Sequence, residues 1–129
     1  MPGVTFGVQL DLAKMDKWLK EHTKGVMEGI GQAVAGCAED AMLLSKAVYV
    51  PVVSGNLRST GEVSDLQVSE GLIEIELSYG GPAAPYAAIV HEAPPDRGQG
   101  KSQYLAKPFY LVGRTMEKRI RDHLASLYD

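Results

Sequence analysis

The sequence predicts an α+β fold: a small, mainly antiparallel sheet packed against a long helix in the first half of the chain and an amphipathic helix at the C-terminus. Apolar residues alternate with polar ones in residues 4–10 and again in residues 72–79, a pattern typical of strands. In residues 26–48 and 107–129 they recur every three or four positions instead, which is typical of helices that bury one face. A small sheet beside two such helices predicts the α+β class.

The first strand is expected over residues 4–10, although Gly7 weakens its signal. Asp11 can cap a short helix expected near residues 11–22. Glycines at positions 25, 29, 31 and 36 argue against one rigid rod, so the chain is expected to break around Thr23–Gly25. A long helix then continues to about Val48. The apolar residues on the helical face are Met15, Leu19, Val26, Ile30, Val34, Cys37, Ala41, Leu44 and Val48.

The stretch that follows the long helix, "YVPVVSGNLRSTG" in residues 49–61, redirects the chain from helix to sheet. Pro51 ends the helix and pushes its neighbour Val50 toward an extended backbone. Gly55 can take a left-handed turn, and Asn56 suits the same turn. The next two residues should then point in opposite directions, the leucine inward and Arg58 outward.

The clearest strand is "LIEIELSY" in residues 72–79, because its apolar residues fall at every second position. The preceding segment, "GEVSDLQVS", is a poorer strand. Val63 is out of phase with Leu66 and Val68, which predicts a bulge or an edge. Residues 69–71, Ser-Glu-Gly, are expected to form a hairpin turn between the two strands.

The region from Gly80 to Gln103 is rich in glycine and proline and reads as irregular, with a short strand or helical turn at "YAAIVHE". The remainder, "KPFYLVGRTMEKRIRDHLASLYD", predicts a single C-terminal helix with Pro108 in its first turn. Its apolar stripe consists of Phe109, Val112, Met116, Ile120, Leu124 and Leu127.

Length and composition describe one ordinary globular domain spanning residues 1–129. Apolar residues make up 45% of the chain and charged residues 22%, and the net charge of −3 does not favour non-specific binding to nucleic acid. The single cysteine cannot form an internal disulfide, which fits folding in a reducing cytoplasm. We expect no signal peptide and no membrane helix.

No arrangement of residues predicts catalysis, so we expect neither an enzyme nor a cofactor. The histidines, His22, His91 and His123, are scattered and expected at exposed or edge positions, and no metal site is expected. Cys37 lies on the apolar face and is expected in the core. Two alternatives remain: a DNA-binding module, which salt-dependent binding would support, and a small hydrolase, which loss of activity on His91→Ala would support.

Three segments, in their order and spacing, resemble the head–tail connector or tail-completion (neck) proteins of long-tailed bacteriophages. They are "PVVSGNLRS" in residues 51–59, "YAAIVHE" in residues 86–92 and "KPF" in residues 107–109. The likeness spans nearly the whole chain. One departure is that "APP" in residues 93–95 and a longer loop replace the Gly-Thr and the short connection usual in that family.

The resemblance implies a structural protein of the virion, made in the cytoplasm of the bacterial host and placed at the neck or the top of the tail. Such a protein would form a homo-oligomeric ring around the DNA path, with six copies favoured over twelve, and would complete the tail or join it to the head. The alternative within this class is a portal-bound adaptor, or another minor capsid or tail-tube-associated protein.

The partners implied are other copies of the chain, neighbouring neck, portal-side or tail proteins, and DNA that passes through without sequence-specific recognition. No membrane or small-molecule substrate is expected. The loop in residues 93–103 is either an ordinary surface loop or a segment that orders against a neighbouring subunit, and Arg58 is either a solvated charge or a subunit contact. Five residues are candidates for the subunit interface or channel: Arg58, Tyr86, Glu92, Arg97 and Lys101.

Overall fold

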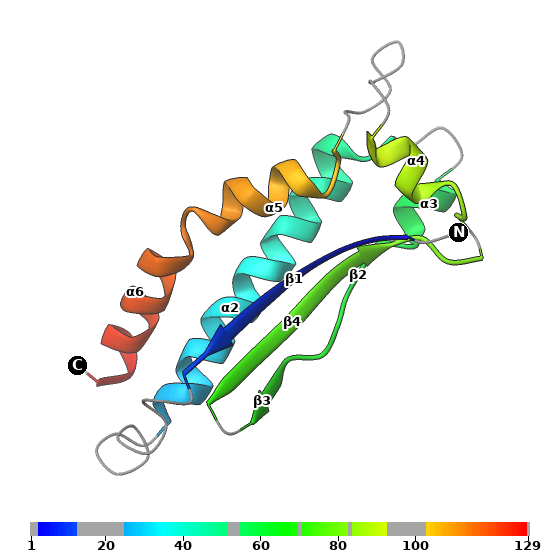
Figure 1. The fold of residues 1–129 in the computed structure, drawn as a ribbon. Helices are drawn as coiled ribbons and strands as arrows, with labels where there is room; N and C mark the ends of the chain where they lie inside the picture. Colours follow the sequence, from blue (N-terminus) through cyan, green and yellow to red (C-terminus); the bar gives the residue numbers. More distant parts are fainter. Residues whose placement is uncertain are drawn as a thin grey trace.

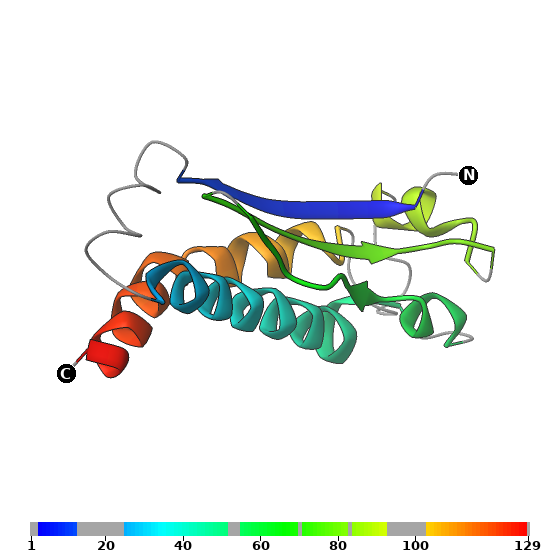
Figure 2. The same cartoon turned by 90° about the horizontal axis from the view of Figure 1, so that it is seen from below.

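The computed structural model describes residues 3–12, 25–51, 55–69, 71–82, 84–92 and 103–128. These residues form two layers, an antiparallel sheet and a set of helices (Figure 1). Figure 2 shows the long helices along one face of the sheet, and no described helix covers the opposite face. The α+β class predicted from the sequence is therefore confirmed.

The described sheet has four strands: β1 (Val4–Asp11), β2 (Glu62–Val63), β3 (Gln67–Ser69) and β4 (Leu72–Tyr79). Strand β4 is central. It pairs along its whole length with β1, from Tyr79 opposite Val4 to Leu72 opposite Asp11. On its other side it pairs first with β3 and then with β2. All of these pairs are antiparallel, so β1 forms one border of the sheet and the two short strands form the other.

The central strand buries one face, as its alternation predicts. Its four inward residues are no more than 3% exposed: Ile73, Ile75, Leu77 and Tyr79. Gly71 precedes the strand with a φ of 85°, a left-handed value that favours glycine, and the adjacent Ser69 lies opposite Leu72. The predicted hairpin turn is thus present, although Glu70 lies outside the described residues.

The segment before β4 is broken into two short strands by one extra residue. Five positions separate Glu62 from Gln67, whereas four separate their partners Ser78 and Glu74. An extra residue on one side of an antiparallel pair is a bulge. The poor phasing of the valines in this segment therefore predicted the irregular border correctly.

The long helix is α2 (Val26–Leu44), preceded by Gly25 with a φ of 80°. The predicted break near residue 25 and the long helix after it are both present. Small residues on its buried face allow a close approach to the sheet. A Cβ atom on Gly31 would lie 2.9 Å from Leu66 Cδ2, so a larger residue here would require the Leu66 side chain to move where α2 crosses the connection between β2 and β3.

A π-helical turn, η1 (Ser45–Tyr49), ends the long helix. The Val50 N–H donates to the Ser45 carbonyl, five residues back, at 2.8 Å. Because this turn is wider than an α-helical turn, it rotates the following residues relative to the buried face. Val48 is consequently 49% exposed, and its predicted place on the apolar stripe is wrong. Val50 has the extended backbone predicted from Pro51.

The short helix predicted near residues 11–22 lies almost entirely outside the described residues. Its expected cap, Asp11, is the last residue of β1 and pairs with Leu72. The helix that Asp11 was expected to cap lies outside the described residues, so its capping role stays a prediction.

Two helices, α5 (Ala106–Gly113) and α6 (Met116–Tyr128), replace the single C-terminal helix that the sequence predicts. Gly113 is a poor helix former, and the Thr115 hydroxyl donates to the Val112 carbonyl at 2.7 Å, so the chain turns between them. Pro108 lies in the first turn of α5, as predicted. Arg119 of α6 forms an ion pair with Asp40 of α2, which holds α6 against the long helix.

Candidate functional site

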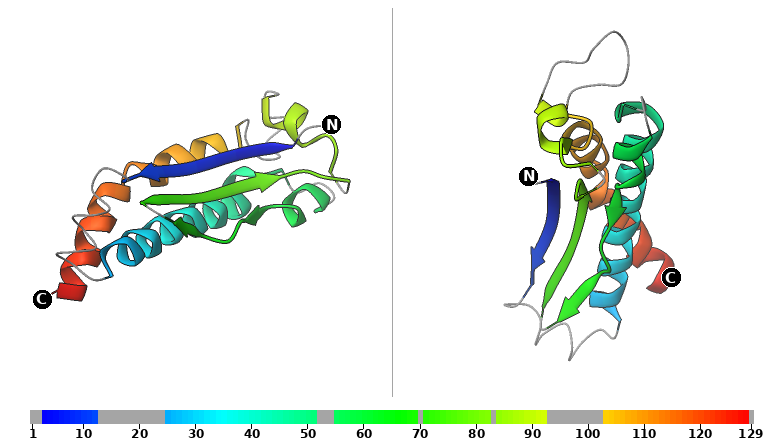
Figure 3. Two further views of the ribbon diagram at one scale, coloured as in Figure 1. Left: turned by 60° about the horizontal axis from the view of Figure 1, so that its bottom comes forward. Right: turned by 90° about the vertical axis from the view of Figure 1, so that its right-hand side faces the viewer.

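The three segments that carry the family resemblance lie toward the same end of the molecule. Residues 56–59 form the short helix α3 (Asn56–Ser59), residues 87–92 form α4 (Ala87–Glu92), and residues 107–109 lie in the first turn of α5. Figures 1 and 3 show α3 and α4 at the end of the sheet where β1 begins, opposite the C-terminal end of α6. We call this end of the molecule, with α3, α4 and the first turn of α5, the α3–α4 end.

Helix α3 is positioned by a glycine turn and by a threonine. Gly55 has a φ of 78°, the left-handed value expected of it, whereas Asn56 is the first helical residue and does not share that turn. Leu57 is 4% exposed and faces the core, as predicted. The Thr60 hydroxyl donates to the Leu57 carbonyl at 2.7 Å and accepts the Gly80 N–H at 3.0 Å, which ties α3 to the end of β4.

Helix α4 divides the residues of "YAAIVHE" between the core and the surface. The sequence left a short strand or a helical turn open, and the structure has a helix. Ala87 and His91 are buried, whereas Tyr86, Ile89 and Glu92 are exposed. The apolar exposed pair, Tyr86 and Ile89, gives this end a surface that another protein can cover.

His91 corrects the expectation that the histidines are exposed or at an edge. It is 3% exposed, and its ring lies edge-on to Tyr104 at a centroid distance of 4.9 Å. Nε2 accepts the Ala106 N–H at 3.2 Å, and Nδ1 lies 2.9 Å from a Glu92 carboxylate oxygen. Because its ring nitrogens are occupied within the fold, His91 joins α4 to α5 and is not presented to a substrate.

A buried hydroxyl network fastens the same end to the long helix. The Ser45 hydroxyl donates to the Tyr104 carbonyl at 2.7 Å and lies 2.7 Å from the Tyr79 hydroxyl. The Tyr104 hydroxyl donates to the Ala87 carbonyl at 2.7 Å. Burial raises the pKa of both tyrosines above the ordinary value, so both phenols stay protonated at neutral pH.

The candidate residues predicted from the sequence are only partly gathered at the α3–α4 end. Arg58 is exposed on α3, and within the described residues it has no carboxylate partner. Tyr86, directly before α4, and Glu92, its last residue, are both exposed. Arg97 and Lys101 lie outside the described residues. The described ends of their loop are joined, because the Gln103 N–H donates to the His91 carbonyl at 2.5 Å.

Along the border of the sheet formed by β1, three residues have backbone groups without a partner among the described residues. The Leu12 N–H donates to the Gly71 carbonyl at 2.6 Å. Hydrogen-bonded pairs alternate with non-hydrogen-bonded pairs along two antiparallel strands, so this bond shows which residues of β1 bond to β4. The even-numbered residues of β1 therefore exchange hydrogen bonds with β4. The N–H and C=O groups of Thr5, Gly7 and Gln9 point the other way, and within the described residues nothing pairs with them. Figure 2 shows β1 along this border of the sheet.

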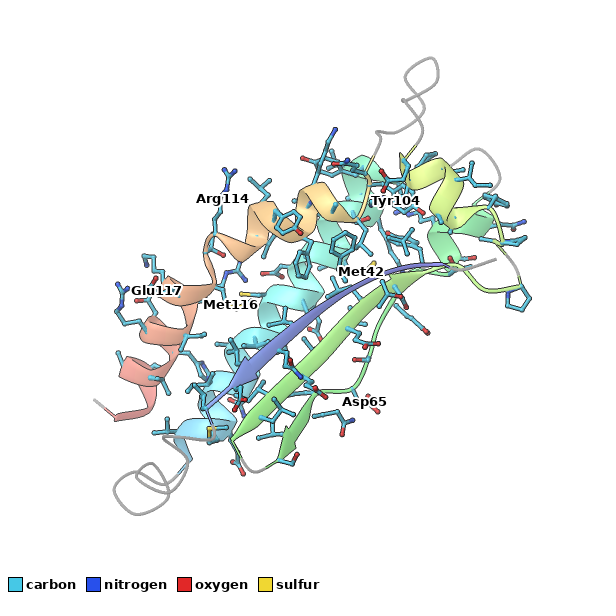
Figure 4. All side chains as sticks on the ribbon, viewed as in Figure 1. Met42, Asp65, Tyr104, Arg114, Met116 and Glu117 are labelled. Carbon is cyan, nitrogen blue, oxygen red and sulfur yellow. The ribbon has the colours of Figure 1, made fainter. Side chains whose placement is uncertain are left out.

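Beside this border lies an apolar pocket of about 520 Å³ between β1, α2 and the junction of α5 with α6. Val8 forms its wall on the strand, and Phe109 and Tyr110 form its wall on α5. Tyr110 is 61% exposed, yet its ring packs edge-on to Phe6 at 6.0 Å. Figure 4 shows Arg114 and Met116, which also line the pocket, at the turn between the helices.

The uncovered face of the sheet is acidic. Glu74 and Glu76 project from β4, Glu62 from β2, and Asp65 lies in the connection between β2 and β3 (Figure 4). The four described strands contain no lysine or arginine. A face of this charge repels DNA phosphates.

Cys37 lies in the core, as predicted, and is 2% exposed. Burial raises the pKa of its thiol and outweighs the nearby Arg119 guanidinium, which acts to lower it. The thiol is therefore neutral at neutral pH and poorly nucleophilic. Among the described residues, no three metal-binding side chains converge, and no helix combines the length and apolar character needed to cross a membrane.

Two features of the structure were not predicted from the sequence: the burial of Ser45 and the open border of β1. Ser45 is four residues beyond Ala41 on the helical stripe, so its burial could have been read from that spacing. The open border of β1 had no such signal, because alternation identifies the faces of a strand and not its neighbours. Comparison with known proteins finds no matching family model, no matching curated protein and no matching solved structure.

Proposed function

We propose that this protein is a structural component of a tailed-bacteriophage particle, of the head–tail connector or tail-completion class. In this proposal several copies form a ring at the neck or the top of the tail and surround the path of the DNA. The order and spacing of the three segments that resemble this family carry the proposal. The placement of those segments at the same end of the molecule supports it.

The buried residues of these segments explain how they could be shared within a family of structural proteins. Leu57, Ala87, His91 and Pro108 are all buried, and Gly55 takes a left-handed turn. The four buried side chains and the glycine turn are needed to pack the helices against this end of the sheet. Such requirements favour a resemblance in architecture over one in catalytic chemistry.

The ring contact in this proposal includes the exposed residues of the α3–α4 end. Arg58, Tyr86 and Glu92 offer one cation, one aromatic ring and one carboxylate on the same end of the subunit. A heterologous contact that repeats and closes produces a ring. The acidic, uncovered face of the sheet fits a protein past which DNA slides without being bound.

The experiment that tests this function is made on particles produced by the genome that encodes the chain. We expect the protein in purified virions by mass spectrometry, and at the neck or upper tail in a reconstruction. Deleting its gene should leave unjoined heads and tails or tails of irregular length. Complete, infectious particles without the protein would overturn the proposal.

A matched pair of variants tests the ring contact. Tyr86→Ala together with Arg58→Ala should leave the subunit folded and lower the yield of joined particles, because both side chains are exposed. The control is Glu39→Ala with Glu28→Ala, two exposed positions on α2 away from the α3–α4 end. Equal particle yields from the two double variants would remove the α3–α4 end from the ring.

A further inference from the structure

The free border of β1 has the properties of a docking site for another strand. Residues 4–10, "VTFGVQL", contain no charge, no proline and no bulge. Exposed edge strands normally carry one of these features, because each discourages pairing with another chain. With the free backbone groups of Thr5, Gly7 and Gln9, this strand is left ready to extend the sheet.

We infer that β1 pairs with β1 of a second copy, antiparallel and across a two-fold axis at Gly7. The order of residue types in the strand is the same in both directions: apolar, polar, apolar, glycine, apolar, polar, apolar. In this register Thr5 lies opposite Gln9 of the other copy, Phe6 lies opposite Val8, and the two glycines face each other. Asp11 stays outside the pairing, so no like charges are brought together.

The hydrogen-bonding geometry fits this register. The groups that point away from β4 belong to odd-numbered residues, and the pairs Thr5–Gln9 and Gly7–Gly7 join only odd-numbered residues. In this register, Thr5 of each copy exchanges backbone hydrogen bonds with Gln9 of the other, and the two Gly7 residues exchange hydrogen bonds with each other. The two four-stranded sheets become one sheet with β1 at its centre.

The apolar pocket beside β1 supplies side-chain contact for the same arrangement. Pairing places Phe6 of one copy next to Val8 of the other, on the side of the sheet that faces the helices. Val8 lines the pocket, and Tyr110 stands exposed at it. A second copy thus covers apolar surface that the single subunit leaves in water.

Gly7 is not required by the single subunit. It does not have a positive φ, and a Cβ atom added to it would meet Glu76 Cγ and the Ile75 carbonyl oxygen at 3.7 Å, an ordinary contact. A side chain can therefore be placed at this position without displacing β4, and in a paired strand it would point out of the plane of the sheet, away from the backbone of the second copy.

The β1 pairing does not depend on the phage function or on the ring. It uses the border of the sheet, whereas the proposed ring contact uses the α3–α4 end. The two proposals can fail separately, because one concerns the mass of the free subunit in solution and the other concerns assembled particles.

The first test is a cysteine substitution at the axis. Facing residues of a hydrogen-bonded pair have Cα atoms about 5.5 Å apart, within the range for a disulfide. We expect purified Gly7→Cys protein to form a covalent dimer under mild oxidation, while buried Cys37 stays reduced. Thr5→Cys is the control, because its two copies would lie about 13 Å apart, four residues at 3.3 Å each. Equal cross-linking of both variants, or of neither, would overturn the register.

The second test removes the donors at the border. We expect wild-type protein at tens of micromolar to have the mass of a dimer by light scattering. Thr5→Pro combined with Gln9→Pro should halve that mass and retain the wild-type circular dichroism, because neither N–H bonds to β4. Thr5→Ala with Gln9→Ala keeps both N–H groups and should stay dimeric. A monomeric wild type, or a dimeric proline variant, would refute the pairing.

Discussion

The two borders of the sheet differ in each property that controls whether a strand can pair with another chain. Strand β1 is eight residues long and unbroken, and it is uncharged as far as Leu10. The opposite border is divided into β2 and β3, with a bulge between them and two carboxylates, Glu62 and Asp65. Bulges, short strands and charges are the usual protections of an exposed edge. One border is therefore protected within the subunit, and the other is open.

At the protected border, Ser64 provides the hydrogen bonds for β4 next to the bulge. The Ser64 hydroxyl accepts the Glu76 N–H at 2.9 Å, and the Ser64 N–H donates to the Glu76 carbonyl at 2.8 Å. The Ser64 hydroxyl thus supplies an acceptor for the Glu76 N–H of β4 next to the bulge, where the regular backbone pairing is interrupted. On the opposite border, the outward groups of Thr5, Gly7 and Gln9 have no such substitute among the described residues. Within the described residues, the protein therefore protects one border of its sheet and leaves the other open to pairing.

The largest effect is expected from shortening Leu77, a core residue that lies between the strands of both borders. Leu77 is fully buried on β4, between Phe6 of β1 and Val63 of β2. We expect Leu77→Ala to lower the free energy of unfolding by about 2–5 kcal/mol, measured by urea denaturation. The control is Leu72→Ala on the opposite face of the same strand, where the side chain is half-buried. Similar losses from the two variants would contradict the assignment of faces.

Alkaline pH should weaken the shared core without acting on either border. Burial raises the folded-state pKa of Tyr79, Tyr104 and Cys37, so their contribution is complete below the unfolded-state values, about 10 for tyrosine and 8.5 for cysteine. It is lost as pH rises toward the folded-state values, by up to about 1.4 kcal/mol per pH unit for each group. Urea denaturation at a series of pH values from about 8 to 11 should show this fall.

The control for the alkaline effect is Tyr104→Phe. This variant lacks one of the three titrating groups, so its stability should fall less steeply with pH than that of the wild type. Its stability at neutral pH should itself be lower, because the hydrogen bond to the Ala87 carbonyl is lost. Parallel curves for the two proteins would show that Tyr104 does not titrate with unfolding.

A matched pair of substitutions compares how firmly each border is held to the helices. The Phe6 ring packs against Phe109 at 5.2 Å and against His91 at 5.9 Å, whereas Val63 is a smaller, half-buried side chain. We expect Phe6→Ala to lower the free energy of unfolding by about 2–3 kcal/mol and Val63→Ala by about 1 kcal/mol. Urea denaturation of both variants measures the difference. A larger loss at Val63 would reverse the comparison.

The smallest effect is expected at the bulge. Ser64→Ala removes the acceptor of the Glu76 N–H, and because the site is exposed we expect a loss of about 0.5 kcal/mol. Amide hydrogen exchange at Glu76 should become faster, while Gly7→Cys cross-linking in the same background should not change. Slower exchange, or altered cross-linking, would show that the two borders do not act independently.

The strength of each sequence pattern decided how much of this fold could be predicted. Alternation identified the buried face of β4, and helical spacing identified α2, because both depend on which residues must leave water. The end of the long helix near Val48 was predicted correctly, but the π-helical form of its last turn and the break between α5 and α6 were not. In the first case a π-helical turn shifted the buried face after Ser45, and in the second Gly113 and the Thr115 hydroxyl ended a helix whose apolar stripe continued.

The candidate site was predicted less completely, because its residues come from distant parts of the chain. Arg58 and Tyr86 are exposed, as an interface role requires, but their shared place at the α3–α4 end follows from how α3 and α4 meet the sheet. His91 was expected at the surface, and only its contacts with Ala106 and Tyr104 reveal that it joins two helices.

The sequence by itself determined the α+β class, the faces of the strands and of the long helix, the left-handed turn at Gly55 and the burial of Cys37. These depend on local geometry and on the transfer of apolar groups out of water, and both can be read from neighbouring residues. Only the tertiary structure decided that β1 lies at a border, that the outward backbone groups of Thr5, Gly7 and Gln9 have no partner among the described residues, and that an apolar pocket lies beside them. The order of strands in a sheet arises from pairings between residues far apart in the chain, for which local patterns carry no signal.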